Sequence, residues 1–187
     1  APDFCLSVEA KDLELDDKWL KALPTKAAEL AAKIHPTGKV NVSADLNAGD
    51  RAVDCPPYRV VIECLGTGVN LDAFPYPVEN VMGTITVNPE NIQLENLTAI
   101  SAPNDTVSGR PVKIVLNGQI AAPNATLVSG RISLQAQNVP LDDKLARALP
   151  ENIASIYRNI APTGTVDLDI NEASFHTDPD AQKWLNL

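Results

Sequence analysis

Two pairs of adjacent carboxylates are the residues whose type and spacing could most readily support chemistry. Asp16 and Asp17 lie near the start of the chain, and Asp142 and Asp143 recur far along it. Paired carboxylates can act as general acid and base or hold a hard cation. Each pair also begins a helical pattern, where a carboxylate caps backbone N–H groups and complements the helix dipole. We expect the capping role, because a duplicated pair is typical of structure and not of a catalytic site.

Other candidates for chemistry are few. The two histidines, His35 and His176, belong to no GxSxG, HExxH or Cys–His nucleophile pattern. The segment 66–68, Gly-Thr-Gly, lacks the further glycine and the helix of a dinucleotide loop, so it predicts a turn or a bulge. The sequence therefore predicts no catalytic residue, no metal site and no cofactor, and we expect a protein that is not an enzyme.

The three cysteines, Cys5, Cys55 and Cys64, have no spacing typical of zinc ligands. A disulfide between Cys55 and Cys64 is possible in an oxidising compartment, whereas three buried thiols are the preferred interpretation. The sequence alone leaves both open.

Composition excludes one class of partner and constrains the core. The 187 residues carry a net charge of −9, which argues against nucleic acid because phosphate binding needs clustered Lys and Arg. Hydrophobic residues make up 44% and aromatic residues 4%, so aliphatic side chains must form the core. No long apolar run predicts a signal peptide or a membrane span, and we expect any membrane attachment to lie outside this sequence.

An internal duplication is the clearest feature of the sequence. Residues 15–42 align without a gap to residues 141–168, at an offset of 126, with 13 identities in 28 positions. The surrounding stretches, 12–46 and 138–172, are called the first and the second cassette below. We expect residues 1–187 to form a single repeat-built domain of about one and a half units, each of roughly 126 residues.

Each cassette predicts two short helices followed by a strand. The first helix has a stripe of apolar residues at i, i+4 and i+8, made by Leu15, Trp19 and Leu23 and again by Leu141, Leu145 and Leu149. Pro24 and Pro150 end that helix and can begin the second one. A Pro-Thr-Gly segment at 36–38 and at 162–164 then turns the chain into a strand.

The remaining sequence alternates apolar and polar residues with a period of two, which predicts β-strands. The predicted strands are 4–11, 39–46, 60–64, 81–87, 112–116, 128–134 and 166–170, with shorter candidates at 69–73 and 92–97 and a long loop over 47–57. Short connections predict antiparallel neighbours. The predicted fold class is α+β: a strongly curved, mostly antiparallel β-sheet with one apolar side and duplicated short helix–helix cassettes.

Two stretches resemble a known family. They are residues 74–85, FPYPVENVMGTI, with LENLT following at 94–98, and residues 141–150, LDDKLARALP, with Pro-Thr-Gly and a strand following. These features resemble the AsmA-like repeat proteins of double-membraned bacteria, the group with TamB-like and YhdP-like members. The resemblance implies repeated antiparallel β units with an apolar groove, a place in the periplasm or cell envelope, and a role in phospholipid transport or outer-membrane assembly.

Two functions follow as hypotheses. In the first, the apolar sheet face binds or conducts phospholipid acyl chains without any reactive residue, and its candidate lining is Ile85, Val87, Val112, Ile114, Leu116, Ile132 and Leu134. In the second, the chain is a structural or protein-interaction module whose apolar residues form an ordinary dry core and bind no ligand. Expected partners are acyl chains in the first case and neighbouring repeats of a parent chain in both.

Overall fold

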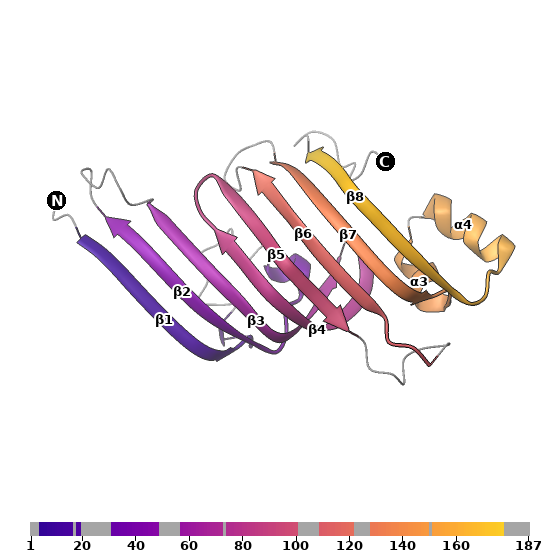
Figure 1. The fold of residues 1–187 in the computed structure, drawn as a ribbon, viewed down its shortest axis with the longest axis horizontal. Coiled ribbons are helices and arrows are strands. Elements are labelled where there is room, and N and C mark those ends of the chain that lie inside the picture. The colour runs from indigo at the N-terminus through magenta and orange to yellow at the C-terminus, as the bar shows by residue number, and fades with distance from the viewer. Residues whose placement is uncertain are drawn as a thin grey trace.

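A computed structural model of the chain describes residues 4–16, 18–19, 31–48, 57–72, 74–100, 109–121, 128–149 and 151–177. Most of them lie in one antiparallel sheet, which Figure 1 shows face on. Its strands are β1 (Phe4–Glu14), β2 (Lys39–Ala48), β3 (Tyr58–Leu71), β4 (Phe74–Val87), β5 (Asn91–Ile100), β6 (Lys113–Ala121), β7 (Val128–Pro140) and β8 (Thr165–Thr177). Between β7 and β8 lie the helices α3 (Asp143–Ala148) and α4 (Glu151–Ile160).

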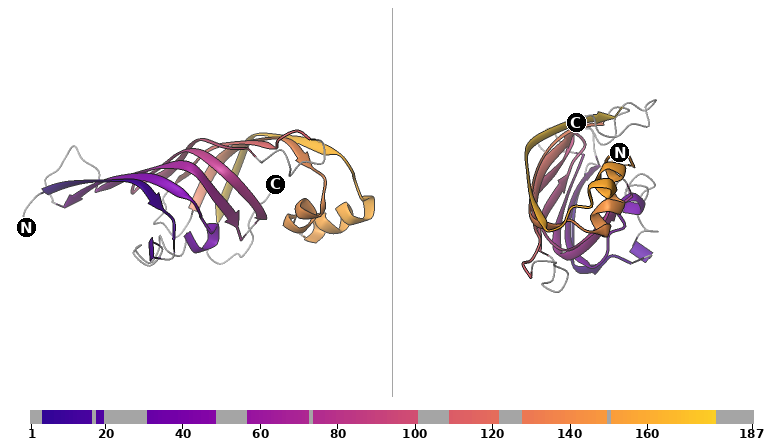
Figure 2. Two further views of the ribbon diagram at one scale, coloured as in Figure 1. Left: turned by 90° about the horizontal axis from the view of Figure 1, so that it is seen from below. Right: turned by 90° about the vertical axis from the view of Figure 1, so that its right-hand side faces the viewer.

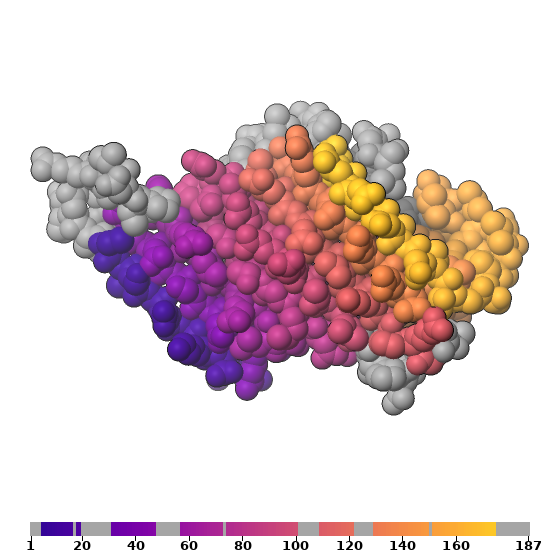
Figure 3. Space-filling model, in the orientation of Figure 1, coloured from indigo at the N-terminus to yellow at the C-terminus, as the bar shows by residue number. Residues whose placement is uncertain are grey.

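The eight strands follow one another in sequence order, β1 to β8, so each hydrogen-bonds to its neighbours along the chain. Every pairing is antiparallel, which confirms the prediction drawn from short connections. Strands β1 and β8 are the two edges of the sheet. In Figure 3 the strands succeed one another across the molecule from β1 to β8, and α4 projects beyond β8.

The predicted strong curvature is wrong, and the chain is mostly β. Figure 2 shows an open, gently arched sheet with the helices on its concave side. Strand twist accumulating across a meander produces such an arch. A closed barrel would require β1 and β8 to pair, and they remain separate edges. Because α3 and α4 have only 6 and 10 residues, they cover a small part of the sheet.

Two strands run further than their alternation predicts. The candidates 60–64 and 69–73 belong to one strand, β3, which ends at Leu71. Strand β4 begins at Phe74 instead of residue 81 and includes Pro75 and Pro77. Proline is tolerated there because the β3–β4 register is irregular at this end and the first pair with β5 is Met82 with Thr98. The two strands together form a long hairpin, the β3–β4 hairpin.

A bulge with a left-handed residue recurs in three strands. Asp12, Asn96 and Asn138 have φ of 54°, 50° and 57°, which Asn and Asp tolerate better than most residues. Each backbone N–H donates to a side-chain oxygen on the following strand: Asn41 Oδ1 at 3.0 Å, Asn117 Oδ1 at 2.7 Å and Asp167 Oδ1 at 2.7 Å. The bulged residue thus gains an acceptor where the regular ladder is interrupted.

Candidate functional site

Six of the seven candidate lining residues lie on one face of the sheet. Leu116 on β6 is opposite Leu134 on β7, and Ile132 is one pair further along on the same side. Ile114, Ile85 and Val87 fall on this face by the same register. All six are half-buried. This side of the sheet is called the apolar face below.

The register adds residues that sequence reasoning did not single out. Strand β5 lies between the candidate strands and contributes Leu94, opposite Ile85, and Leu97, opposite Leu116. Their alternation was visible in the sequence, but the bulge at Asn96 shifts the phase between them. Val112 is the exception among the candidates, because it precedes β6 and is buried. It therefore does not line an accessible surface.

The apolar face is incompletely covered within the described ranges. Toward the β1 edge, Leu6 and Val8 are 45% and 47% exposed, and toward the β8 edge Leu168 is 45% exposed. None of the larger described side chains is fully buried. Most buried apolar residues are small: Ala31, Ala99, Ala136, Ala148 and Ala154, with Val40, Cys64, Val81 and Val112. Many of the larger aliphatic side chains of the face are therefore left partly open.

A compact core exists where the end of the β3–β4 hairpin covers the sheet. Cys64, Val81 and Ala99 form its centre. Two groups of half-buried residues pack against it: Val69 and Val78 from the hairpin, and Ile85, Leu97 and Ile114 from the apolar face. Figure 2 places the helices on the concave side, and α3 packs against β4. The concave side is therefore the apolar one.

The cysteine predictions receive a partial answer. Cys64 is buried and forms no disulfide, so the Cys55–Cys64 disulfide is wrong for this structure. Cys55 itself lies outside the described residues. Burial raises the pKa of the Cys64 thiol, and a hydrogen bond with Thr67 opposes that rise. Cys5 is exposed, contrary to the expected burial, because it lies on the polar face of the edge strand β1.

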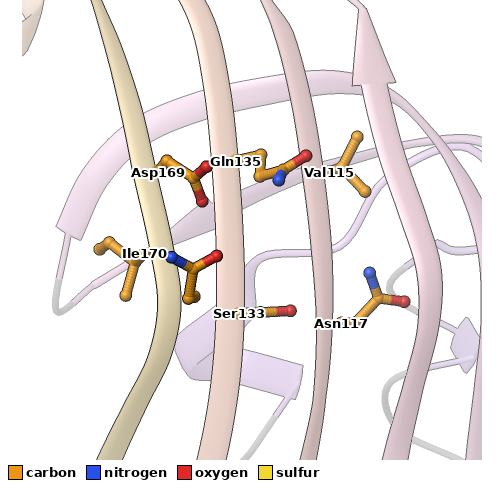
Figure 4. Close-up of a pocket in the computed structure, with 7 residues that line it drawn as sticks. Val115, Asn117, Ser133, Gln135, Asp169 and Ile170 are labelled. Carbon is orange, nitrogen blue, oxygen red and sulfur yellow. The ribbon is translucent and has the colours of Figure 1, made fainter.

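The opposite, convex face is polar and carries a shallow depression of about 270 Å³. It is lined by Val115, Asn117, Ser133, Gln135, Asp169, Ile170 and Asn171. Figure 4 shows these side chains coming from the adjacent strands β6, β7 and β8. The depression lies where β8 bulges between Ile170 and Ala173. It contains amide, hydroxyl and carboxylate groups but no catalytic arrangement.

The carboxylate pairs are helix caps wherever their geometry is described. Asp142 Oδ1 accepts hydrogen bonds from the backbone N–H groups of Lys144 and Leu145, both at 3.0 Å. Asp16 Oδ1 accepts equivalent bonds from Lys18 at 3.0 Å and Trp19 at 2.9 Å. These bonds satisfy amides that lack an acceptor in the first helical turn. Asp17 and the segment 20–30 lie outside the described residues.

The predicted stripe of the first helix is only partly supported. Leu145 and Leu149 in the second cassette are half-buried and not fully buried. The second helix, α4, has apolar residues that face solvent, since Ile153, Ile156 and Ile160 are exposed. Ala154 is the buried residue of that helix.

Of the two histidines, only His35 has a described side chain. His35 Nε2 lies 2.8 Å from Asp72 Oδ1, and both side chains are more than half exposed. An exposed pair of this kind contributes little to stability and lacks a nucleophile. His176 lies in β8 opposite Ser129, and its side chain lies outside the described part. The segment 66–68 is a bulge in β3, as predicted, with Gly66 at φ 82°.

Within the described ranges, no cluster of three or more His, Cys, Asp or Glu side chains is arranged to hold a metal ion. Among the same residues, no helix combines the length and apolar character needed to cross a membrane.

Comparison with known protein families, with curated proteins and with solved structures finds no match to this chain. The class that the fold itself defines is an open, eight-stranded antiparallel meander with helices on its concave side.

Proposed function

We propose that this chain is a non-enzymatic repeat module of a large bacterial envelope protein, and that its apolar face binds or conducts phospholipid acyl chains. The observation that carries the proposal is the partial exposure of aliphatic residues on the apolar face outside the compact core, from Leu6 on β1 to Leu168 on β8. A soluble monomer rarely leaves so extended an apolar surface without a partner.

The chemistry of the face suits an acyl chain. Its central lining is aliphatic, from Ile85 through Leu116 to Leu134, and contains no charged side chain at these positions. Burying apolar area is worth roughly 25 cal/mol per Å², whichever aliphatic ligand supplies it. The open edges of the arch would leave a polar headgroup in water. Binding of this kind needs no reactive residue, and the resemblance to AsmA-like proteins supports the envelope setting.

Mass spectrometry of an organic extract from the purified protein tests this proposal. We expect phospholipid in stoichiometric amount, and native mass spectrometry should show the intact complex. The double variant Ile114→Asp and Ile132→Asp should lose the lipid, because it places two charges on the apolar face. The matched control is Val115→Asp with Ser133→Asp, which changes the next residue on each strand and therefore places the same two charges on the polar face.

The outcomes separate the alternatives when circular dichroism shows that each variant keeps its β-sheet. Lipid lost only from the apolar-face variant supports the proposal. A lipid-free extract from folded wild-type protein overturns it. Equal loss from both double variants would also count against binding at this face.

A structural or protein-interaction module is the second candidate, in which the apolar residues serve as an ordinary core and bind no ligand. The duplicated cassettes and the two edge strands favour it, because an edge strand can pair with another chain or a neighbouring repeat. A clean extract combined with assembly in solution would favour this function.

A further inference from the structure

The first cassette is clasped by the β3–β4 hairpin through backbone hydrogen bonds. Thr37 N–H donates to the Gly68 carbonyl and Gly68 N–H donates to the Thr37 carbonyl, both at 2.9 Å. At the hairpin end, Asp72 N–H donates to the Lys33 carbonyl at 3.0 Å. These bonds fix the Pro-Thr-Gly segment and the last helical turn against strand β3.

Glycines allow the two segments to approach closely. A Cβ on Gly38 would lie 3.3 Å from both the Gly66 carbonyl oxygen and the Thr67 Cα. A Cβ on Gly68 would lie 2.5 Å from Thr37 Oγ1, so the Thr37 side chain or the backbone would have to shift. The Thr67 hydroxyl also donates to the Lys39 carbonyl at 3.2 Å. The crossing therefore depends on small residues from both sides.

The second cassette repeats the backbone of the first but has no such hairpin against it among the described residues. A Cβ on Gly164, the counterpart of Gly38, would meet nothing within 4 Å. Both Thr37 and its counterpart Thr163 are exposed, but Thr163 has no backbone hydrogen bond like those of Thr37 within the described ranges. Ile160 is 69% exposed, whereas its counterpart Ile34 is half-buried.

The edge strand next to it differs in the same way. Val40 on β2 is 2% exposed because β1 and β3 flank it, with Cys64 opposite. Val166, its counterpart on β8, is 39% exposed at the edge of the sheet. Exposed positions therefore follow one another from the end of α4 through the Pro-Thr-Gly segment to the start of β8.

We propose that the second cassette and the β8 edge form a docking surface for a β-hairpin of the β3–β4 type. The incoming strand would pair with β8 as β3 pairs with β2, and a small residue would cross at Thr163 and Gly164. Strand addition at an open edge supplies main-chain hydrogen bonds, while the crossing supplies specificity. Docking of a hairpin at this surface requires no bound lipid, so a lipid-free extract would not count against it.

Charge defines which hairpin fits. In the first cassette, Asn41 Nδ2 donates to Glu63 Oε2 of the neighbouring β3 at 2.8 Å. The counterpart of Asn41 is Asp167, whose carboxylate would repel a glutamate at the position of Glu63. Ala161 replaces His35, so the side-chain hydrogen bond with Asp72 is also lost. The preferred partner is therefore a hairpin with a neutral or basic residue opposite Asp167.

The test tethers a hairpin to the full chain. A flexible Gly/Ser linker of about 20 residues, spanning about 25 Å on average, would join the C-terminus to a second copy of residues 57–89. Three versions of that copy are compared: the original sequence and two single variants, Glu63→Lys and Gly68→Val. Hydrogen–deuterium exchange of peptides covering residues 159–170 reports docking, because pairing protects the β8 amides.

We expect exchange over residues 159–170 to slow at least tenfold with the Glu63→Lys copy and less with the original copy. The Gly68→Val copy should leave exchange unchanged, because its side chain would collide with Thr163 at the crossing. Equal exchange in all versions and in the untethered chain overturns the proposal. Protection of these peptides in the untethered chain by a concentration-dependent dimer also overturns it and assigns the surface to a second copy.

Discussion

The two cassettes share their local geometry closely. Leu15 and Leu141 each donate a backbone hydrogen bond to the glycine of the Pro-Thr-Gly segment, Gly38 and Gly164, at 2.9 Å in both cassettes. The bulges also coincide, since the β1–β2 register shifts between Ala10 and Leu13 and the β7–β8 register shifts between Ala136 and Val139. His35, which follows the helical residues 31–34, and Ala161, which follows α4, both have φ of 46°.

Their surroundings differ. The β3–β4 hairpin crosses the first cassette at Thr37, whereas no described strand crosses the second cassette at Thr163. A short sequence pattern therefore specifies caps, turns and bulges without specifying burial. Burial depends on which other strands reach the same place. Substitutions at matched positions measure how much stability each kind of interaction contributes.

The largest difference is expected at Val40 and Val166, the matched valines near the start of β2 and β8. Val40→Asp should lower the free energy of unfolding by about 3 kcal/mol or more, because it buries an unpaired charge. Val166→Asp, at the open edge, should cost less than about 1 kcal/mol. Urea unfolding monitored by circular dichroism gives both values. Equal losses would mean that Val40 and Val166 have equivalent environments in solution.

The next difference is expected at the glycines. Gly38→Ala and Gly164→Ala both introduce a side chain at positive φ, 92° and 107°, which costs about 1–2 kcal/mol. Only Gly38 also has the Gly66 carbonyl and Thr67 within 3.3 Å of the new methyl. We expect a further loss of about 1 kcal/mol there from overpacking. Thermal unfolding of the two variants compares them, and a larger loss at Gly164 would contradict the clasp.

A smaller difference in stability is expected between Ile34 and Ile160, the matched isoleucines at the ends of the helices, again with the larger loss in the first cassette. Ile34→Ser removes a half-buried side chain and should cost about 1 kcal/mol. Ile160→Ser removes an exposed one and should change stability by less than about 0.5 kcal/mol. Urea midpoints measure both. A substantial loss at Ile160 would indicate that its surface is already covered in the isolated chain.

The caps should show no difference between cassettes. Asp16→Ala and Asp142→Ala each remove an acceptor for two backbone N–H groups, and each should cost about 1 kcal/mol. The Asn variant at each position, which keeps a capping oxygen, is the matched control. If Ala costs nothing at either site while Asn behaves identically, the carboxylate has no capping role there.

The smallest effect concerns pH and exists only in the second cassette. Burial, followed by the charges of Asp142 and Asp143, raises the pKa of Tyr157, and its hydroxyl donates to the Asp142 carbonyl at 3.4 Å. The first cassette has Ala31 at this position. A raised pKa means that the folded state holds the proton more tightly than the unfolded state. The associated stability is therefore complete below the ordinary tyrosine pKa of about 10 and is lost as pH rises above it.

Urea midpoints measured between about pH 9 and about pH 11 should fall less steeply in Tyr157→Phe than in the wild type. Tyr58→Phe, on β3, is the control for general alkaline effects. An identical pH dependence in wild type and Tyr157→Phe would show that this phenol is not linked to folding.

Sequence patterns predicted the strands well but not their extent. Alternation located most strands because side chains on a pleated strand point to opposite faces. It missed the continuation of β4 through Pro75 and Pro77, since prolines are penalised in strands unless a neighbour leaves them unpaired. The shared face of the candidate residues was predictable from parity, whereas the burial of Val112 and the contributions of Leu94 and Leu97 required the register.

Three features of the structure follow from the sequence alone: the Asp16 and Asp142 caps, the Pro-Thr-Gly segments and the antiparallel order of the strands. These depend on residues a few positions apart or on short connections, so they form wherever the pattern recurs. Only the tertiary structure decided that Val40 is buried and Val166 is open. That outcome depends on whether a distant hairpin crosses the cassette and on how far the twisted sheet arches. Neither property is encoded in the alternation of a single strand.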